Sequence, residues 1–193
     1  MRKIDFNRDW TVQKEGQERV EHVNLPHDAM LYEKRAKENK TASASAYFEG
    51  GKYIYKKIWD VDAQTAEQTN ILEFEGVYQN ARISLNGNQI AERPYGYTNF
   101  YVDLTDLLTV GQNEIQVIAD NADVPNSRWY SGSGIYIGHV CVNRRYICSR
   151  QESGTAEQDK CKAQCDDIYG AYIWRAYGGN RSYRYLRAGC HKR

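Results

Sequence analysis

Three short motifs in this sequence contain residue types that can do chemistry. His27 and Asp28 form a dyad of the kind that supports a general base, but the chain holds no Ser or Cys nucleophile signature to go with it. The run 131–134, Ser-Gly-Ser-Gly, lacks the G-x-S-x-G spacing of a nucleophile elbow. We therefore predict no catalytic residue, and we expect His27 and Asp28 to tie the N-terminal segment to neighbouring loops. Asp103 and Asp106, at a strand end, are expected to accept hydrogen bonds from turn amides.

The cysteines are a second possible source of chemistry, and all five lie after position 140. Cys141 and Cys148 are separated by six residues, and Cys161 and Cys165 by three, so neither pair has the two-residue spacing of a zinc knuckle. A disulfide framework would leave one cysteine unpaired. The sequence thus favours neither a metal site nor a disulfide-bonded appendage, and it predicts no cofactor.

The middle of the chain, which must position any site, has the pattern of an all-β protein. Strand patterns occur at 53–59, 71–75, 81–85, 89–91, 100–104 and 113–119. Asn86-Gly87 is the strongest short hairpin signal, a loop rich in turn formers covers 121–134, and Ile135-Tyr136 opens a last strand. Short strands at near-regular spacing, with almost no helical period, predict an antiparallel β-sandwich of the jelly-roll type.

The first 45 residues have little periodicity and are expected to cover the sandwich. Trp10 supplies a large apolar anchor, and the charged run 33–45 predicts a mobile loop or a short helix.

Composition excludes several classes of protein. A net charge of +1 gives no field that would attract nucleic acid or an anionic membrane. No stretch approaches the ~20 apolar residues of a membrane span. The first ten residues are polar and charged and contain no apolar signal-peptide core, so we expect a cytoplasmic protein.

Residues 141–193 differ in composition from residues 1–140. The first part holds fifteen basic and twenty acidic residues, and the second holds eleven and five. The second part has only five aliphatic core formers and no Phe or Pro, which predicts a poorly ordered Cys/Arg/Tyr-rich tail. One hypothesis is that the sequence from about residue 137 is an out-of-frame translation, which the coding DNA would test.

Several segments in 1–140 resemble the N-terminal sugar-binding domain of family 2 glycoside hydrolases, the β-galactosidase and β-glucuronidase group. In chain order they are Trp10, Leu25–Met30, Gly50–Tyr53, Phe74–Ala81 with Asn86-Gly87, Tyr95–Phe100 with 103–105, and Asn121 with Pro125–Tyr136. Their order makes the resemblance specific, and it implies a galactose-binding-domain-like jelly roll over 1–140.

The resemblance also implies which residues contact sugar. Asn99 is the best candidate for a hydroxyl ligand, since an amide both donates and accepts hydrogen bonds, although it could simply start a strand. Asn126 lies where relatives carry an Asp or Asn near the sugar. Trp129 could stack on sugar or anchor its loop, Arg128 could bind sugar or pair with an acid of another domain, and Tyr97 could contact sugar or pack.

Members of this family usually continue into a barrel that carries two catalytic glutamates. Neither motif occurs here, and a barrel alone takes ~250 residues. The resemblance therefore implies a truncated carbohydrate-binding module that is inactive on its own, with β-galactoside-like sugars and the remaining domains of the hydrolase as partners. The alternatives are a structural domain that supports the active site without independent sugar binding, and one piece of an active retaining enzyme.

Overall fold

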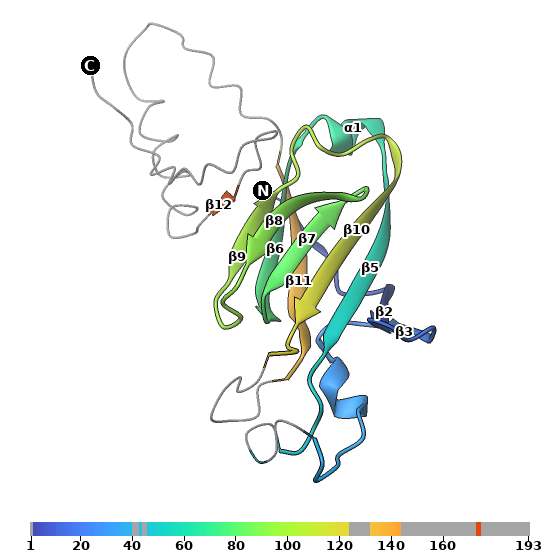
Figure 1. The fold of residues 1–193 in the computed structure, drawn as a ribbon. Coiled ribbons are helices and arrows are strands. Elements are labelled where there is room, and N and C mark those ends of the chain that lie inside the picture. The colour runs from blue at the N-terminus through green and yellow to red at the C-terminus, as the bar shows by residue number, and fades with distance from the viewer. Residues whose placement is uncertain (1, 40–42, 44–45, 124–131, 144–172, 175–193) are drawn as a thin grey trace, which may run out of the picture.

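The computed structural model describes residues 2–39, 43, 46–123, 132–143 and 173–174, and these form two β-sheets that enclose one core (Figure 1). Residue 140, at which the sequence analysis divides the chain, lies within a strand. Apart from 141–143 and 173–174, the predicted tail lies outside the described residues.

One sheet has the strand order β1-β11-β6-β9-β12, and β4 also pairs with β11. Its strands are β1 (Arg2–Asp5), β4 (His27–Asp28), β6 (Thr69–Tyr78), β9 (Phe100–Asp103), β11 (Gly134–Asn143) and β12 (Ile173–Trp174). The pairing of β12 with β9 is parallel, and the other pairings in this sheet are antiparallel.

The second sheet has the order β3-β2-β5-β10-β7-β8, and all its pairings are antiparallel. Its strands are β2 (Trp10–Lys14), β3 (Val20–Val23), β5 (Lys52–Val61), β7 (Ala81–Leu85), β8 (Asn88–Arg93) and β10 (Gly111–Asp120). Asn86 and Gly87 both have positive φ, 50° and 81°, in the turn between β7 and β8. The predicted hairpin is confirmed.

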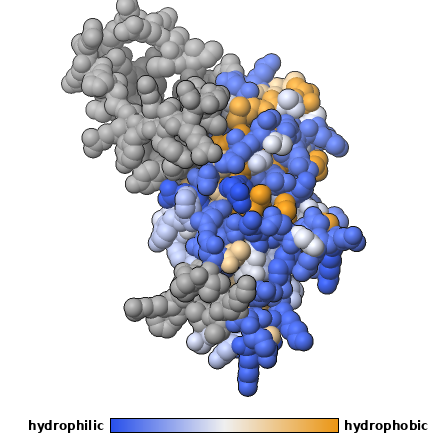
Figure 2. Space-filling view, viewed as in Figure 1, coloured by the Kyte–Doolittle hydropathy of each residue, from blue (hydrophilic) through white to orange (hydrophobic). Residues whose placement is uncertain are grey.

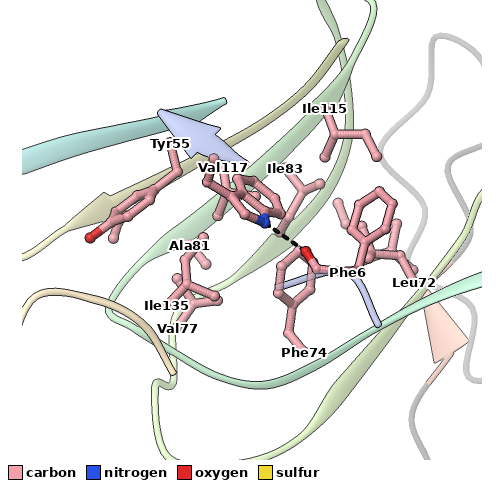
Figure 3. Packing of buried hydrophobic residues seen from close by; sticks show 14 of the residues in the cluster. Phe6, Tyr55, Leu72, Phe74, Val77, Ala81, Ile83, Ile115, Val117 and Ile135 are labelled. Atoms are coloured by element: carbon pink, nitrogen blue, oxygen red, sulfur yellow. Dashed lines mark hydrogen bonds between the residues drawn. The ribbon is translucent and has the colours of Figure 1, made fainter. Parts of the chain in front are cut away.

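The predicted all-β sandwich is also confirmed, because the strands bury alternate residues against one another. Along β10 the buried positions are Asn113, Ile115, Val117 and Ala119. The core holds Trp10, whose indole N–H donates a 2.7 Å hydrogen bond to the carbonyl of Phe6 (Figure 3). Phe74 of β6 stacks on Phe100 of the neighbouring strand β9, with ring centroids 5.0 Å apart.

The N-terminal segment is more regular than its sequence indicates. Besides β1 to β4 it holds a 3-10 helix, η1 (Ala29–Tyr32), just before the run in which a loop or helix is predicted. A one-turn helix, α1 (Ala63–Ala66), lies at the opposite end of the sandwich (Figure 1). The face shown in Figure 2 is largely hydrophilic, and its apolar patches gather toward the end that carries α1.

Candidate functional site

The described parts of the predicted site loops lie at the end of the sandwich opposite α1 (Figure 1). Two short backbone hydrogen bonds join them to the turn after β6. The N–H of Asn80 donates to the carbonyl of Pro94 at 3.1 Å, and the N–H of Asp120 donates to that of Gln79 at 2.7 Å. The segment 94–99 and the start of the 121–133 connection therefore share one end of the fold.

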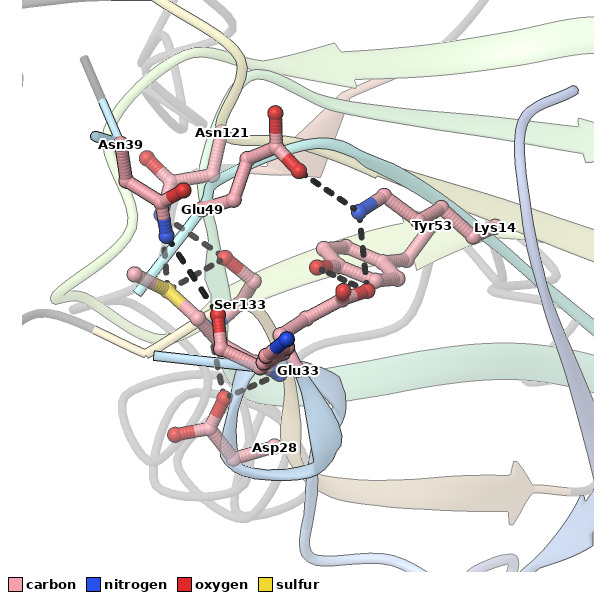
Figure 4. Close-up of polar contacts among 10 residues, drawn as sticks. Lys14, Asp28, Glu33, Asn39, Glu49, Tyr53, Asn121 and Ser133 are labelled. Atoms are coloured by element: carbon pink, nitrogen blue, oxygen red, sulfur yellow. Dashed lines mark hydrogen bonds and ion pairs between the residues drawn. The ribbon is translucent and has the colours of Figure 1, made fainter. Parts of the chain in front are cut away.

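Asp28 fastens the far end of the 121–133 connection to the N-terminal segment. Its Oδ1 accepts hydrogen bonds from the backbone N–H groups of Met30, at 3.1 Å, and Ser133, at 2.8 Å (Figure 4). A Cβ atom at Gly132 would overlap the Asp28 carboxylate, so this close approach requires glycine. The predicted tie between the dyad and a neighbouring loop is confirmed for Asp28.

Asn121 closes the same connection from its other end. Its buried side-chain amide donates to the hydroxyl of Ser133 at 2.7 Å and to the carbonyl of Gly132 at 3.2 Å (Figure 4). The sulfur of Met30 lies 3.4 Å from the Ser133 hydroxyl. The two ends of the connection, at Asn121 and Ser133, are thus held together in a buried polar cluster.

A second polar cluster fastens the segment that follows η1. Lys14 Nζ lies 2.9 Å from Glu33 Oε1 and 3.8 Å from Glu49 Oε2, and the Tyr53 hydroxyl donates to Glu33 Oε1 at 3.2 Å (Figure 4). Burial, and then the charge of Glu33, raises the pKa of Tyr53, which stays protonated as a donor. This cluster holds η1 against β2 and β5.

His27, which directly precedes Asp28 in the sequence, is half-buried. Its Nδ1 is 2.9 Å from the Tyr55 hydroxyl, and its ring stacks on that of Tyr32 with centroids 5.4 Å apart and planes 9° apart. Burial lowers the pKa of His27, and the charges of Asp28 and Glu21 oppose this only in part. The imidazole is therefore neutral near neutral pH.

Tyrosines form the outer rim of this end. The register of β11 against β6 shifts between Ile135 and Ile137, where Tyr136 bulges out of the pairing, and shifts back between Ile137 and Gly138. Bulges re-aim side chains. Burial raises the pKa of Tyr136 to about 12, with smaller electrostatic contributions from Asp28, Tyr97 and Tyr78. Its hydroxyl therefore remains a donor.

The loop 94–99 is pressed onto the end of β6. A Cβ atom at Gly96 would lie 2.9 Å from the Tyr78 Cα and 3.0 Å from the Val77 carbonyl oxygen. This contact brings the Tyr97 ring to 5.0 Å from the Tyr78 ring, and Tyr95 to 5.8 Å from Tyr97. Tyr97 nevertheless remains 59% exposed, so packing leaves part of its surface open to a ligand.

The structure brings together two of the five predicted sugar-contacting residues. Tyr97 and Asn99 are both exposed on the same loop, and Asn99 directly precedes β9. The other three, Asn126, Arg128 and Trp129, lie outside the described residues.

The sequence did not point to Tyr136. It predicted that Asp28 ties the N-terminal segment to a neighbouring loop, but it did not identify Ser133 as the partner. The strand pattern at 135–136 was the available signal for Tyr136, but nothing local indicated a bulge there. Asp103 accepts a 2.9 Å hydrogen bond from the Thr105 N–H, which confirms its predicted turn role.

Within the described ranges, no three His, Cys, Asp or Glu side chains are grouped so that they could hold a metal ion. The helices described are all too short or too polar to cross a membrane.

Comparison with known proteins gives consistent matches. The family described as glycosyl hydrolase 2 galactose-binding domain-like matches residues 7–151. A beta-galactosidase of Bacteroides ovatus is 37% identical over an alignment of 143 residues, and the match covers 68% of this chain and 17% of that protein. A putative beta-glucuronidase of Formosa agariphila is 36% identical over 116 residues, which are 60% of this chain and 11% of that protein. The chain thus spans less than a fifth of the length of these relatives.

Solved structures agree with the sequence matches. A beta-glycosidase from Bacteroides vulgatus superimposes with a TM-score of 0.69 at 29% identity, over 75% of this chain and 20% of that one. A glycosyl hydrolase family 2 member from Bacteroides cellulosilyticus gives a TM-score of 0.68 at 29% identity, over 75% and 21%.

Proposed function

Because the chain belongs to the galactose-binding domain-like family of glycosyl hydrolase family 2, we propose that it forms a carbohydrate-contacting wall of a glycosidase active site and does not cleave glycosides itself. The sugar is a β-galactoside or a related β-glycoside, as the names of the relatives suggest. The remaining domains of the glycosidase are its protein partners.

One observation carries this proposal. The exposed loop with Tyr97 and Asn99, the bulged Tyr136 and the anchored ends of the 121–133 connection lie at one end of the sandwich. Amide and phenol groups both donate and accept hydrogen bonds, as a sugar requires. A ring of such groups on a rigid sandwich is suited to holding a sugar in one orientation.

The non-catalytic part of the proposal rests on what retaining hydrolysis requires. Two carboxyl groups must lie about 5–5.5 Å apart on either side of the scissile bond. The sequence has neither catalytic-glutamate motif of the family, and Asp28, a carboxylate at this end of the sandwich, accepts hydrogen bonds from the N–H groups of Met30 and Ser133. This module supplies orientation, and the acid chemistry belongs to another domain.

Saturation-transfer NMR of the full chain with methyl β-galactoside tests the binding. We expect transfer to the sugar protons that is reduced by Tyr97→Ala and by Asn99→Ala. Val110→Ala should leave it unchanged, because Val110 is an exposed residue that directly precedes β10, at the end of the sandwich that carries α1. Absence of transfer would overturn the binding proposal in favour of a purely structural domain. Turnover of a chromogenic β-galactoside above the buffer rate would overturn the non-catalytic part.

A further inference from the structure

Tyr32 is an exposed aromatic side chain beside the proposed sugar-binding end. It is 74% exposed, although one face of its ring is covered by the parallel ring of His27. The opposite face is therefore open to solvent. An open, flat aromatic face attracts the polarised C–H groups of a pyranose through its negative potential.

The backbone that carries Tyr32 is held in place by hydrogen bonds at both ends of η1. Asp28 caps η1 by accepting from the Met30 N–H, and the Glu33 N–H donates to the Met30 carbonyl at 3.1 Å at its end. The imidazole that backs the ring is itself held 2.9 Å from the Tyr55 hydroxyl. A preorganised ring loses little conformational entropy on binding.

Packed side chains tie Tyr32 to the end of the sandwich that carries the rim tyrosines. His27 contacts both Tyr32 and Tyr55, with ring centroids 5.4 and 5.7 Å apart. The Tyr55 hydroxyl lies beside Gly134, where an added Cβ would be 2.8 Å from it, and Gly134 pairs with Tyr78, against which Tyr97 packs. Fully buried Tyr55 thus helps to hold Tyr32 at the same end of the sandwich as the loop 94–99.

We propose that Tyr32 stacks on a second pyranose ring of a β-linked oligosaccharide whose first ring contacts Tyr97 and Asn99. The inference rests on the proposed function and extends it from a terminal sugar to the adjoining one. The phenol and the neutral imidazole behind it bring no fixed charge, which suits an uncharged pyranose. Leu31, 59% exposed, directly precedes Tyr32 on the same helix.

Saturation-transfer NMR of the full chain with lactose tests this inference, because lactose joins galactose to a second ring, glucose. We expect transfer to protons of both rings in the unmodified chain. Tyr32→Ala should reduce the glucose signals by more than half and leave the galactose signals unchanged, and Tyr32→Trp should restore them. Leu31→Ala, which removes apolar surface from the same helix without removing the ring, is the matched control and should retain most of the glucose signal.

The outcomes separate the two proposals. Galactose signals together with glucose signals that do not respond to Tyr32→Ala would overturn the inference and leave the proposed function standing. An equal loss from Leu31→Ala would assign the surface to general apolar contact and overturn stacking. Absence of signals from both rings would overturn the proposed function together with the inference.

Discussion

Asp28 accepts a 2.8 Å hydrogen bond from the backbone N–H of Ser133, a residue 105 positions later in the chain. The same oxygen caps η1 through the N–H of Met30. One carboxylate thus sets the relative position of two segments at the candidate site, and its removal would affect both.

We predict that Asp28→Ala lowers the free energy of unfolding by about 2 kcal/mol, since it removes a helix cap and leaves the N–H of buried Ser133 without its acceptor. Urea denaturation followed by circular dichroism measures this. Asp60→Ala, at an exposed carboxylate on β5, is the control and should stay within ~0.5 kcal/mol of the unmodified chain. Equal effects in the two variants would contradict the anchoring role.

Trp10 should contribute more to stability than Trp59. It is fully buried and its indole N–H is satisfied by Phe6, so Trp10→Ala should cost about 4 kcal/mol. Trp59 also contacts Phe6 but is only partly buried, and Trp59→Ala should cost clearly less. Thermal melts of the two variants side by side would show a smaller shift for Trp59→Ala. The reverse order would refute this account of the core.

The close approach of the loop 94–99 to β6 makes Gly96 sensitive to substitution. In Gly96→Ala the new methyl meets the backbone of Tyr78 and Val77, which cannot yield as a flexible side chain would. We expect a loss of stability of about 1–3 kcal/mol from this overpacking, and an altered near-ultraviolet tyrosine spectrum as Tyr97 is displaced. The control is Gly87→Asn at an open turn, where asparagine tolerates the positive φ. It should keep the native spectrum.

Acidification should weaken the fold through His27. The pKa of His27 is lowered below 6.5 in the folded chain, so folding favours the neutral ring. The stabilisation is complete above the unfolded pKa and is lost as the pH falls from about 6.5 toward the lower folded pKa. Melting temperatures at pH 7.5 and 5.5 measure the loss. A His27→Gln variant should lose less stability over this interval, and an unchanged difference would rule out this residue as a source.

Local sequence chemistry predicted the parts of the fold that depend on neighbouring residues. Asn-Gly at 86–87 specifies a turn by itself, and the alternation at 113–119 specifies a half-buried strand. The regularity of the N-terminal segment was not predictable in this way, because strands such as β1 form only with a distant partner, Arg2 opposite Val142. Short strands of this kind carry too few residues for a periodic signal.

The candidate site was predictable to a similar extent. The motif around 95–100 pointed to Tyr97 and Asn99, which do lie exposed at the loop end. Tyr136 was missed because it lies at an irregularity in the pairing of β11 with β6, strands that lie far apart in sequence. A bulge of this kind changes no local pattern, so it becomes visible only once the register is known.

The central position of β11 between β1 and β6 has a consequence for synthesis on the ribosome. Until residues 134–143 leave the exit tunnel, β1 and β6 lack a common neighbour and present unsatisfied backbone edges to solvent or to other nascent chains. Such edges recruit foreign strands. Translational pausing shortly before this segment emerges should increase chaperone capture, whereas pausing well after it should not.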